Sequence, residues 1–314
     1  MENPELSIIL LNYNNSNMTI DCLKCLKKQN YINFEIIIVE NNSNLKEKKK
    51  LFSYISELTQ NFQKKIQIIE NDKNYGFAKG NNIGIRYSGG KFILLLNSDT
   101  EFESNFLQKG IRFFRSEKID IMSPKIIYFH NKIRIWNAGG SINFLNPSLA
   151  SIRGAREIDR GQYDHIINVD YASGCCFFIK RKILDQIGLL DDDYFMYYEE
   201  TDLCKRAYLN NFNVIFNPFI KIYHKAHDTA SEFKIYLLLR NKFIFLFKFF
   251  PIIKILIQFM LQPLQIFLYA FNRKTKSINF KIIRKCVKYI FLGIYLGLLK
   301  RFHEPGKMLQ NARN

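Results

Sequence analysis

Acidic side chains are almost missing from the last quarter of this chain. Residues 231–314 contain 16 Lys and Arg but only two acids, Glu232 and Glu304. Of the net charge of +18 carried by the 314 residues, +14 therefore belongs to this stretch and only +4 to the 230 residues before it. A chain of this length exceeds one typical domain. The imbalance predicts a near-neutral globular part at 1–230, followed by a basic and apolar tail at 231–314.

The chain also lacks an uninterrupted apolar run of the roughly 20 residues that span a bilayer. The longest candidate, 252–271, is interrupted by Lys254, Gln258, Gln262, Pro263 and Gln265. Basic residues interleaved with Phe, Ile and Leu are typical of amphipathic helices that lie on an anionic membrane surface. We therefore expect the tail to bind the membrane surface rather than to span it. A helical cap or a homodimer contact is the alternative, and the tail has no signature of nucleic-acid binding.

Regular cysteine spacing and a cleavable leader are missing as well. The six cysteines follow no disulfide or zinc pattern, and Met1–Glu5 has no signal-peptide character. Cys22 and Cys25 have the spacing of a redox or half-zinc site but no second pair, so we interpret them as one face of a helix. Cys175 and Cys176 lie in an apolar run and are interpreted as packing residues. These features predict a cytoplasmic protein that is peripheral on the inner face of the cell membrane.

Neither of the common glycine-rich phosphate-binding patterns occurs in the sequence. The segment Asn74-Tyr75-Gly76-Phe77-Ala78-Lys79-Gly80-Asn81-Asn82 nevertheless places glycines and small residues where a loop enters a helix. Backbone amides at such a helix start can approach a phosphate, with Lys79 as the counter-charge. A tight turn with a helix cap explains the same residues without a ligand.

What the chain has instead is a series of short, Ile- and Leu-rich runs separated by helix-length segments. The expected strands are Leu6–Leu11, Phe34–Val39, Ile66–Glu70 and Lys91–Leu96, and the expected helices are Thr19–Gln29, Leu45–Gln63 and Gly80–Ser88. Apolar runs without alternation are typical of parallel strands that are covered on both faces. The pattern predicts an α/β protein with a doubly wound, mostly parallel sheet.

Polar residues follow three of these strands. Asn12-Tyr13-Asn14, Glu40-Asn41-Asn42-Ser43 and Asn97-Ser98-Asp99 stand at the ends of the first, second and fourth runs. Open α/β sheets bind their ligands in the crevice outside the carboxyl ends of the strands. Three polar ends on one predicted edge favour a nucleotide-binding crevice over three unrelated surface loops.

Two acidic clusters carry the candidate chemistry. Asp99 ends the fourth strand, and Glu199-Glu200-Thr201-Asp202 follows an aromatic run about a hundred residues later. One carboxylate could hold a metal on a diphosphate while another removes a proton from an acceptor hydroxyl, which sugar transfer from a nucleotide requires. The second cluster also fits an acidic first turn of a helix, which the helix dipole favours. We interpret Asp191-Asp192-Asp193 as a solvated loop before a strand at Phe195.

In this order, the segments resemble family 2 of the inverting, GT-A type glycosyltransferases, especially its bacterial rhamnosyltransferase-like branch. The resemblance covers roughly residues 5–230. Ser7–Asn14, Ile37–Ser43, Asn74–Asn82 and Leu95–Asp99 look like the family's two nucleotide-side strands, its Asn-x-Gly-Phe-Ala-x-Gly-Asn-Asn segment and its metal-binding strand end. Asp170–Cys176 resembles the beginning of the acceptor half, Phe195–Arg206 the Glu-Asp-x-Asp helix start, and Tyr223-His224 a downstream metal-site histidine.

The resemblance implies a role for each of these residues. Asp99 and His224 would hold Mg²⁺ or Mn²⁺, Glu200 would be the general base, and Glu199 and Asp202 would bind or position the acceptor hydroxyl. The nucleotide-sugar donor would be bound by Asn12, Tyr13, Glu40, Asn42, Asn74, Gly76, Lys79, Asn81 and Asn97. Glu40 and Glu200 each carry one methylene more than the Asp that the family usually has there. Asn97 replaces the first Asp of a full Asp-x-Asp.

The resemblance thus implies a metal-dependent, inverting hexosyltransferase that moves a sugar, with dTDP-rhamnose as the suggested donor, to a lipid-linked or cell-surface polysaccharide such as O-antigen. Its GT-A domain would occupy 1–230, with the nucleotide-binding half at 1–100 and the acceptor and catalytic half at 101–230. The basic amphipathic helices at 231–314 would associate with the membrane. One alternative is a UDP-hexose or UDP-N-acetylhexosamine donor. A non-catalytic, membrane-bound glycan-binding scaffold is the other.

Overall fold

The computed structural model describes residues 4–61, 66–115, 118–225, 232–272 and 277–303. The chain divides into two compact units. The first unit contains 4–140, 152–195 and the described residues from 199 to 225, and the second contains 141–151, 196–198 and the described residues from 232 onward. The predicted domain boundary at residues 230 and 231 lies outside the described residues. The chain therefore enters the second unit at two short segments before its C-terminal helices begin.

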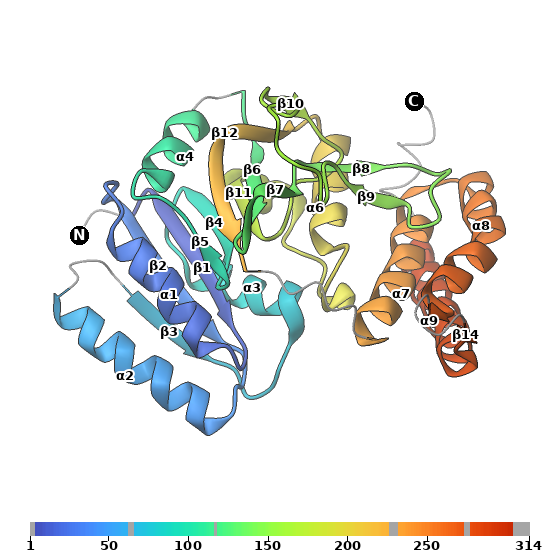
Figure 1. Cartoon of the computed structure of the whole chain (residues 1–314), viewed down its shortest axis with the longest axis horizontal. Coiled ribbons are helices and arrows are strands. Elements are labelled where there is room, and N and C mark those ends of the chain that lie inside the picture. The colour runs from blue at the N-terminus through green and yellow to red at the C-terminus, as the bar shows by residue number, and fades with distance from the viewer. Residues whose placement is uncertain (1–3, 62–65, 116–117, 226–231, 273–276, 304–314) are drawn as a thin grey trace. The chain divides into compact units, whose positions relative to one another are not determined.

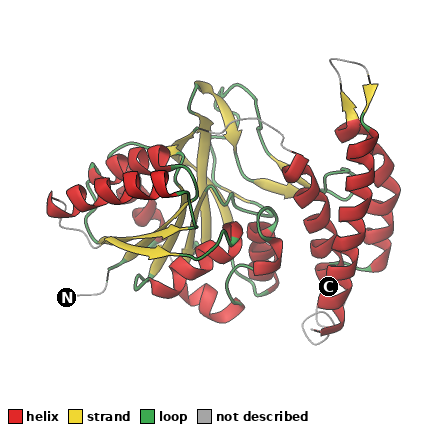
Figure 2. Ribbon diagram, turned by 90° about the horizontal axis from the view of Figure 1, so that it is seen from below, coloured by secondary structure: helices red, strands yellow, loops and turns green. Residues whose placement is uncertain are grey.

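The first unit is built on one mixed sheet with the strand order β10-β12-β6-β11-β4-β1-β2-β3. Its N-terminal half is parallel, because β1 pairs with both β2 and β4, and β2 pairs with β3, in parallel register. Helices cover both faces of these strands, as Figures 1 and 2 show. The elements are β1 (Leu6–Asn12), α1 (Ser16–Lys27), β2 (Phe34–Glu40), α2 (Leu45–Asn61), β3 (Ile66–Glu70), α3 (Gly76–Tyr87) and β4 (Phe92–Asn97). The predicted doubly wound, mostly parallel arrangement is confirmed.

The second half of this sheet brings a new segment to the crevice edge. β11 runs antiparallel to β4, with Cys176 opposite Leu96, so the residues just before β11 lie beside the end of β4. β12 runs parallel to β6 and ends at the same edge. The elements are β5 (Thr100–Glu101), α4 (Phe106–Phe114), β6 (Ile121–Tyr128), β7 (Asn131–Asn137), β10 (Ile167–Asn168), β11 (Cys176–Lys180), α5 (Arg181–Ile187), α6 (Glu199–Leu209) and β12 (Val214–His224).

The strand expected at Phe195 does not form. A short 3₁₀ helix, η1 (Asp192–Tyr194), precedes this point instead. Phe195, Tyr197 and Tyr198 then adopt positive φ angles of 63°, 71° and 75°. The aromatic run predicts a strand because aromatic side chains favour strands, but left-handed residues cannot continue an extended backbone. The aromatic residues therefore form a tight, irregular segment that leads directly into α6.

Three helices dominate the second unit: α7 (Glu232–Phe249), α8 (Ile252–Ala270) and α9 (Phe280–His303). α9 approaches α7 very closely at two glycines. A Cβ atom on Gly293 would lie 2.2 Å from the Arg240 carbonyl oxygen, and one on Gly297 would lie 2.7 Å from Phe247 Cβ. Glycines four residues apart are a known means of bringing two helix backbones together. The short strands β8 (Gly140–Ile142), β9 (Ala150–Ile152), β13 (Phe271–Asn272) and β14 (Ser277–Ile278) form two hairpins.

α8 carries its polar residues inside and its apolar residues outside. Gln258, Gln262 and Gln265 are 0%, 5% and 3% exposed. Gln258 Nε2 donates to the carbonyl oxygens of Phe144 and Asn146, at 2.7 and 3.0 Å. The opposite face exposes large apolar side chains, namely Ile252, Ile253, Leu256, Met260, Leu264, Phe267 and Leu268. This polarity is the reverse of that of a helix packed on a soluble core.

Among the described residues, α8 is the one helix that is long and apolar enough to cross a membrane, with 19 residues and a mean hydropathy of 1.5. The glutamines that interrupt the apolar run in the sequence all lie on its buried face. Their side chains are used inside the second unit, so they leave an apolar outer surface intact. The reasoning from uninterrupted length therefore underestimated how apolar the outside of this helix is.

Candidate active site

Asp99 and His224 meet at the carboxyl ends of their strands. His224 ends β12 and pairs with Thr100 of β5. Its Nε2 atom lies 3.0 Å from Asp99 Oδ1. The two atoms are not aligned for a hydrogen bond, and within the described part of the chain Asp99 Oδ1 and both ring nitrogens of His224 are buried without a hydrogen-bond partner. Because buried polar atoms are nearly always paired, this arrangement fits two ligands of a shared cation.

A divalent metal fits this pair. A carboxylate and an imidazole suit Mn²⁺, and a carboxylate with phosphate oxygens suits Mg²⁺. The described residues contain no group of three or more His, Cys, Asp or Glu side chains that could hold a metal ion. Asp99 and His224 would therefore supply two ligands, and donor phosphates and water would supply the rest, as is common for Mg²⁺ at phosphate sites.

Trp136 fixes the orientation of the His224 ring. The two rings meet edge-on, with centroids 4.4 Å apart and an interplanar angle of 77°. Trp136 lies on β7 and is the only tryptophan of the chain. Sequence reasoning missed this residue, and its uniqueness in the chain is the signal that could have found it.

α6 begins with two glutamates, Glu199 and Glu200. Glu199 is 4% exposed, and Oε2 of both Glu199 and Glu200 is buried without a hydrogen-bond partner among the described residues. Burial raises the pKa of Glu199 well above its ordinary value, and the charge of Glu200 raises it further. Burial also raises the pKa of Glu200, to about 7, although the backbone amides of Glu200 and Thr201 act in the opposite direction. A carboxylate with a pKa near neutrality is suited to accept and release a proton.

Gly174 and Cys175 lie between the Asp99–His224 pair and these carboxylates. The Asn97 amide donates to the Cys175 carbonyl oxygen at 2.9 Å. After burial, the charge of Asp99 is the next cause that raises the pKa of the Cys175 thiol. On the other side, a Cβ atom on Gly174 would lie 3.8 Å from Glu200 Cβ. The two acidic clusters, far apart in sequence, therefore flank one short segment just before β11.

Asp202 is used inside the protein. It is 0% exposed, its Oδ1 accepts from Arg206 Nε at 2.7 Å and its Oδ2 accepts from the Tyr194 hydroxyl at 3.1 Å. Arg206 also donates to the carbonyl oxygens of Ile187 and Leu189, at 2.5 and 2.7 Å. Of the two roles expected for Asp202, the geometry favours positioning of α6 over direct contact with an acceptor.

The nucleotide edge has buried and exposed members. Glu40 is 0% exposed, and its two oxygens accept from Asn12 Nδ2 and from the Ser43 amide, both at 2.5 Å. Asn12 and Glu40 therefore support the edge from within. Tyr13, which is 47% exposed, and Asn42, which is exposed with a φ angle of 64°, are the predicted donor-binding residues that face solvent here.

The start of α3 differs from the predicted phosphate site. Gly76 has a φ angle of 78°, and a Cβ atom there would lie 2.5 Å from the Phe195 ring and from the Phe195 carbonyl oxygen. That oxygen accepts from the Phe77 and Ala78 amides, at 2.6 and 3.2 Å. The amides expected to contact phosphate are thus used by the protein itself. The glycine is required because the Phe195 segment approaches so closely.

The remaining predicted donor residues lie around this helix. Asn74 Oδ1 accepts from Asn41 Nδ2 at 2.8 Å, Asn81 Nδ2 donates to the Phe77 carbonyl oxygen at 2.9 Å, and Lys79 Nζ lies 4.4 Å from the centre of the Tyr75 ring. Asn97 Oδ1 and Nδ2 stand at the half-buried end of β4. Asn74 and Asn81 therefore each use their side chains within the protein, and Lys79 lies over the Tyr75 ring.

The acidic run at Asp191–Asp193 is more structured than the predicted solvated loop. Asp192 and Asp193 are exposed, but Asp192 Oδ1 accepts from Asn82 Nδ2 at 2.6 Å. Asp191 accepts from the Asp193 amide and caps η1. This run therefore joins η1 to α3.

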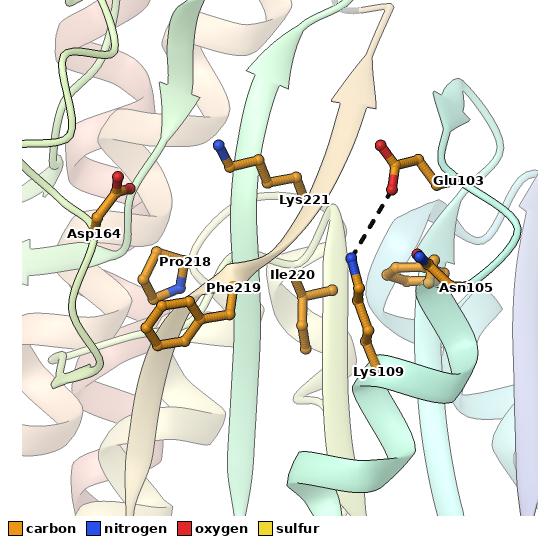
Figure 3. Close-up of a pocket in the computed structure, with 9 residues that line it drawn as sticks. Glu103, Asn105, Lys109, Asp164, Pro218, Phe219, Ile220 and Lys221 are labelled. Atoms are coloured by element: carbon orange, nitrogen blue, oxygen red, sulfur yellow. Dashed lines mark ion pairs between the residues drawn. The ribbon is translucent and has the colours of Figure 1, made fainter.

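A separate hollow of about 320 Å³ contains none of the predicted site residues. Figure 3 shows it between α4 and the bulged part of β12, with Glu103 and Lys109 forming an ion pair of 3.9 Å. Its lining is Glu103, Asn105, Phe106, Lys109, Asp164, Pro218, Phe219, Ile220 and Lys221. This hollow is therefore not the candidate active site. Among the described residues, Asp99, His224, Glu199 and Glu200 have buried polar atoms without hydrogen-bond partners, and none of these four lines the hollow.

Several known proteins are similar to this chain. The hexosyltransferase Agl10 of low-salt glycan biosynthesis in Haloferax volcanii is 28% identical over 249 residues, which cover 76% of this chain and 75% of that protein. The dTDP-rhamnosyl transferase RfbF of Shigella flexneri is 24% identical over 234 residues, covering 73% and 72% of the two chains. The solved mannosyltransferase PcManGT from Pyrobaculum calidifontis, in complex with GDP-Man and Mn²⁺, aligns with a TM-score of 0.57 at 10% identity, over 97% of this chain and 76% of that one.

The structural likeness establishes the GT-A fold. In this fold, the Asp99–His224 pair and the α6 carboxylates lie at one edge of the sheet. The model of the family described as glycosyl transferase family 2 matches residues 7–188, which is more than half of the chain. That stretch holds β1 to β4, Asp99 and the Gly174 segment. With this match, the chain belongs to glycosyl transferase family 2 and is a glycosyltransferase.

Proposed function

We propose that this chain is a metal-dependent, inverting glycosyltransferase that moves a sugar from a nucleoside diphosphate to a hydroxyl of a lipid-linked or cell-surface glycan. The observation that carries the proposal is the pair Asp99 Oδ1 and His224 Nε2, 3.0 Å apart and without hydrogen-bond partners among the residues described. A Mg²⁺ or Mn²⁺ ion bound by this pair would stabilise the negative charge of the leaving diphosphate.

Glu200 performs the proton transfer in this proposal. Its carboxylate accepts the proton of the acceptor hydroxyl while that oxygen attacks the anomeric carbon from the side opposite the diphosphate. One displacement without a covalent intermediate inverts the configuration at that carbon. Glu199 holds its proton more tightly than a free glutamate does, because burial and the charge of Glu200 raise its pKa well above the ordinary value. In its protonated form it can donate a hydrogen bond to the acceptor.

We propose dTDP-rhamnose as the donor. The name of the Shigella relative, a dTDP-rhamnosyl transferase at 24% identity, supports this choice. In the proposal, the exposed Tyr13 and Asn42 contact the base and ribose, while Asn12 and Glu40 hold the edge from below. The test is release of nucleoside diphosphate from dTDP-, UDP- and GDP-sugars with Mn²⁺, with Mg²⁺ or with EDTA.

Turnover should be fastest with dTDP-rhamnose and should stop in EDTA. If a UDP-hexose or a UDP-N-acetylhexosamine turned over fastest, the proposed donor would be wrong, but the proposed reaction would stand. Nucleotide binding without turnover of any donor, even with acceptor lipid present, would contradict catalysis and favour a glycan-binding scaffold.

We further propose that the second unit binds the cytoplasmic face of the cell membrane through the outer face of α8. Leu256, Met260, Leu264 and Phe267 are spaced by four, four and three residues and therefore lie on one side of the helix; they are 49%, 83%, 50% and 46% exposed. The net charge of +14 in residues 231–314 complements an anionic membrane surface. An exposed apolar face in a basic stretch of chain fits lipid better than water.

Changing Leu256 and Leu264 to glutamate should release the protein from membranes. The two carboxylates would have to leave water if the face stayed in lipid, and that costs several kcal/mol. In flotation with vesicles of anionic lipid, the wild type should rise with the vesicles and the double variant should stay in the bottom fraction. Ile133→Glu on β7, at a position 60% exposed, is the matched control and should float normally. A double variant that floats like the wild type would disprove this surface.

The proposed base predicts the pH dependence of turnover. Glu200 must be deprotonated to act, and burial raises its pKa to about 7. The value of kcat should therefore rise as the pH increases through about 7 and then level off, falling about tenfold for each unit below it. Steady-state rates at saturating donor and acceptor between pH 5.5 and 8.5 measure this. A flat profile over that range would remove Glu200 as the base.

A further inference from the structure

The segment immediately before Glu199 has a backbone that is costly to hold. Phe195, Tyr197 and Tyr198 all have positive φ angles, of 63°, 71° and 75°. Non-glycine residues rarely adopt positive φ angles, and they persist in this region only where the surroundings fix them. Three such residues within four positions therefore require strong local contacts.

Asn241 of α7 supplies such contacts. Asn241 is 0% exposed. Its Nδ2 atom donates to the carbonyl oxygens of Met196 and Tyr197, at 2.8 and 2.7 Å. Both amide hydrogens are thus used on two consecutive peptides of the segment. Arg240 Nε donates to Asn241 Oδ1 at 2.8 Å, which holds the amide with its NH₂ group toward the segment.

Two further contacts hold the end of the segment within the second unit. The Tyr198 hydroxyl donates to the Ser148 carbonyl oxygen at 2.9 Å, and the Tyr198 ring packs against Phe245 of α7 with centroids 5.7 Å apart. Lys234 Nζ lies 5.5 Å from the centre of the Tyr197 ring. Residues 196–198 are therefore fixed by α7 and by the 141–151 segment.

We propose that Asn241 is a positioning residue for Glu199 and Glu200. Tyr198 is joined to Glu199 by a peptide bond, so the contacts that hold the backbone of residues 196–198 also restrain the backbone at the first residues of α6. A misplacement of about 1 Å in a reacting group can cost about 10²-fold in rate. The inference rests on the proposed function and extends it, because it gives the C-terminal helices a part in catalysis as well as in membrane binding.

The test compares two buried amides of the second unit. Asn241→Leu removes the two N–H donors at nearly constant volume. Gln258→Met is the matched control, because Gln258 Nε2 also donates to two backbone carbonyl oxygens, but these belong to Phe144 and Asn146, away from the sequence of α6. We would measure kcat per nucleotide-binding site, the donor KM, and the affinity for nucleoside diphosphate with Mn²⁺, using the full chain.

For Asn241→Leu we expect kcat per site to fall by about 10- to 100-fold, with donor KM and nucleotide affinity unchanged. Gln258→Met should keep its kcat. An equal loss in both variants, or no loss in Asn241→Leu, would overturn the inference. If Asn241→Leu does not fold, Tyr198→Phe decides: several-fold lower kcat at unchanged nucleotide affinity supports the inference, and an unchanged kcat overturns it.

The same experiment separates this inference from the proposed function. A wild-type chain that transfers no sugar from any donor overturns both. An active wild type beside an unaffected Asn241→Leu variant overturns the positioning role alone.

Discussion

Replacing Glu200 with glutamine is expected to lower kcat by about 10²- to 10⁴-fold, which is the usual contribution of a general base. The amide has nearly the same size but cannot take the proton of the acceptor hydroxyl. The affinity for nucleoside diphosphate and Mn²⁺ should be unchanged, because Asp99 and His224 remain in place. Initial rates of transfer to acceptor, together with calorimetric titration of the nucleotide, measure both quantities.

The control for this prediction is Asp193→Asn, which neutralises an exposed carboxylate of η1 a few residues away. It should leave kcat unchanged. A Glu200→Gln variant that retains most of its activity would show that another group, or water, takes the proton.

The same substitution should also stabilise the fold at alkaline pH. Burial raises the pKa of Glu200 from 4.5 to about 7, so the folded chain binds this proton more tightly than the unfolded chain does. Its contribution to stability is complete below pH 4.5 and is lost as the pH rises through about 7. Glu200→Gln removes that loss, so its Tm should exceed that of the wild type at pH 8 and approach it at lower pH.

Removing the side chain of either Asp99 or His224 is expected to reduce turnover by at least about 10²-fold. This is the usual effect of losing one group that stabilises developing charge. Asp99→Ala and His224→Ala should also weaken the binding of nucleoside diphosphate in Mn²⁺ much more than in EDTA. The physical reason is that each change leaves the ion with one protein ligand. Calorimetry with and without Mn²⁺, beside donor turnover, tests the two effects separately.

His165→Ala provides the control, because His165 is an exposed imidazole of the same unit and should affect neither quantity. If His224→Ala bound nucleotide equally well with and without Mn²⁺ and kept its turnover, the pair would be an ion pair with a structural role. That result would remove the observation on which the proposed function depends.

The parts of this protein that follow local rules were predictable. β1 to β4 end within one residue of the expected limits, because each is rich in Ile, Leu or Val and is followed by polar residues. Asp99 could be singled out for the same reason, since it follows a buried strand. His224 had no such local signal and was found only through the family resemblance, and its contact with Asp99 depends on the pairing of β12 with β5.

Other features depend on contacts between distant segments. The carbonyl oxygen of Phe195 occupies the amides at the start of α3, and nothing in the sequence near Gly76 announces it. Asn241 looks like a polar interruption of an apolar run, yet its amide holds Met196 and Tyr197. The three glutamines of α8 were also taken as interruptions. Their spacing of four and three residues is that of one helix face, and this signal could have been found.

The reversed polarity of α8, together with the membrane surface proposed above, determines which residues should be changed to make a more hydrophilic form of this enzyme. Deleting the tail would remove α7 along with the hydrogen bonds that Asn241 makes to the segment before α6. Replacing the exposed apolar residues of α8 with hydrophilic ones, while Gln258, Gln262 and Gln265 are kept, would leave those hydrogen bonds intact. The three glutamines of α8 are buried. A more hydrophilic protein therefore requires substitutions on only the outer face of this one helix.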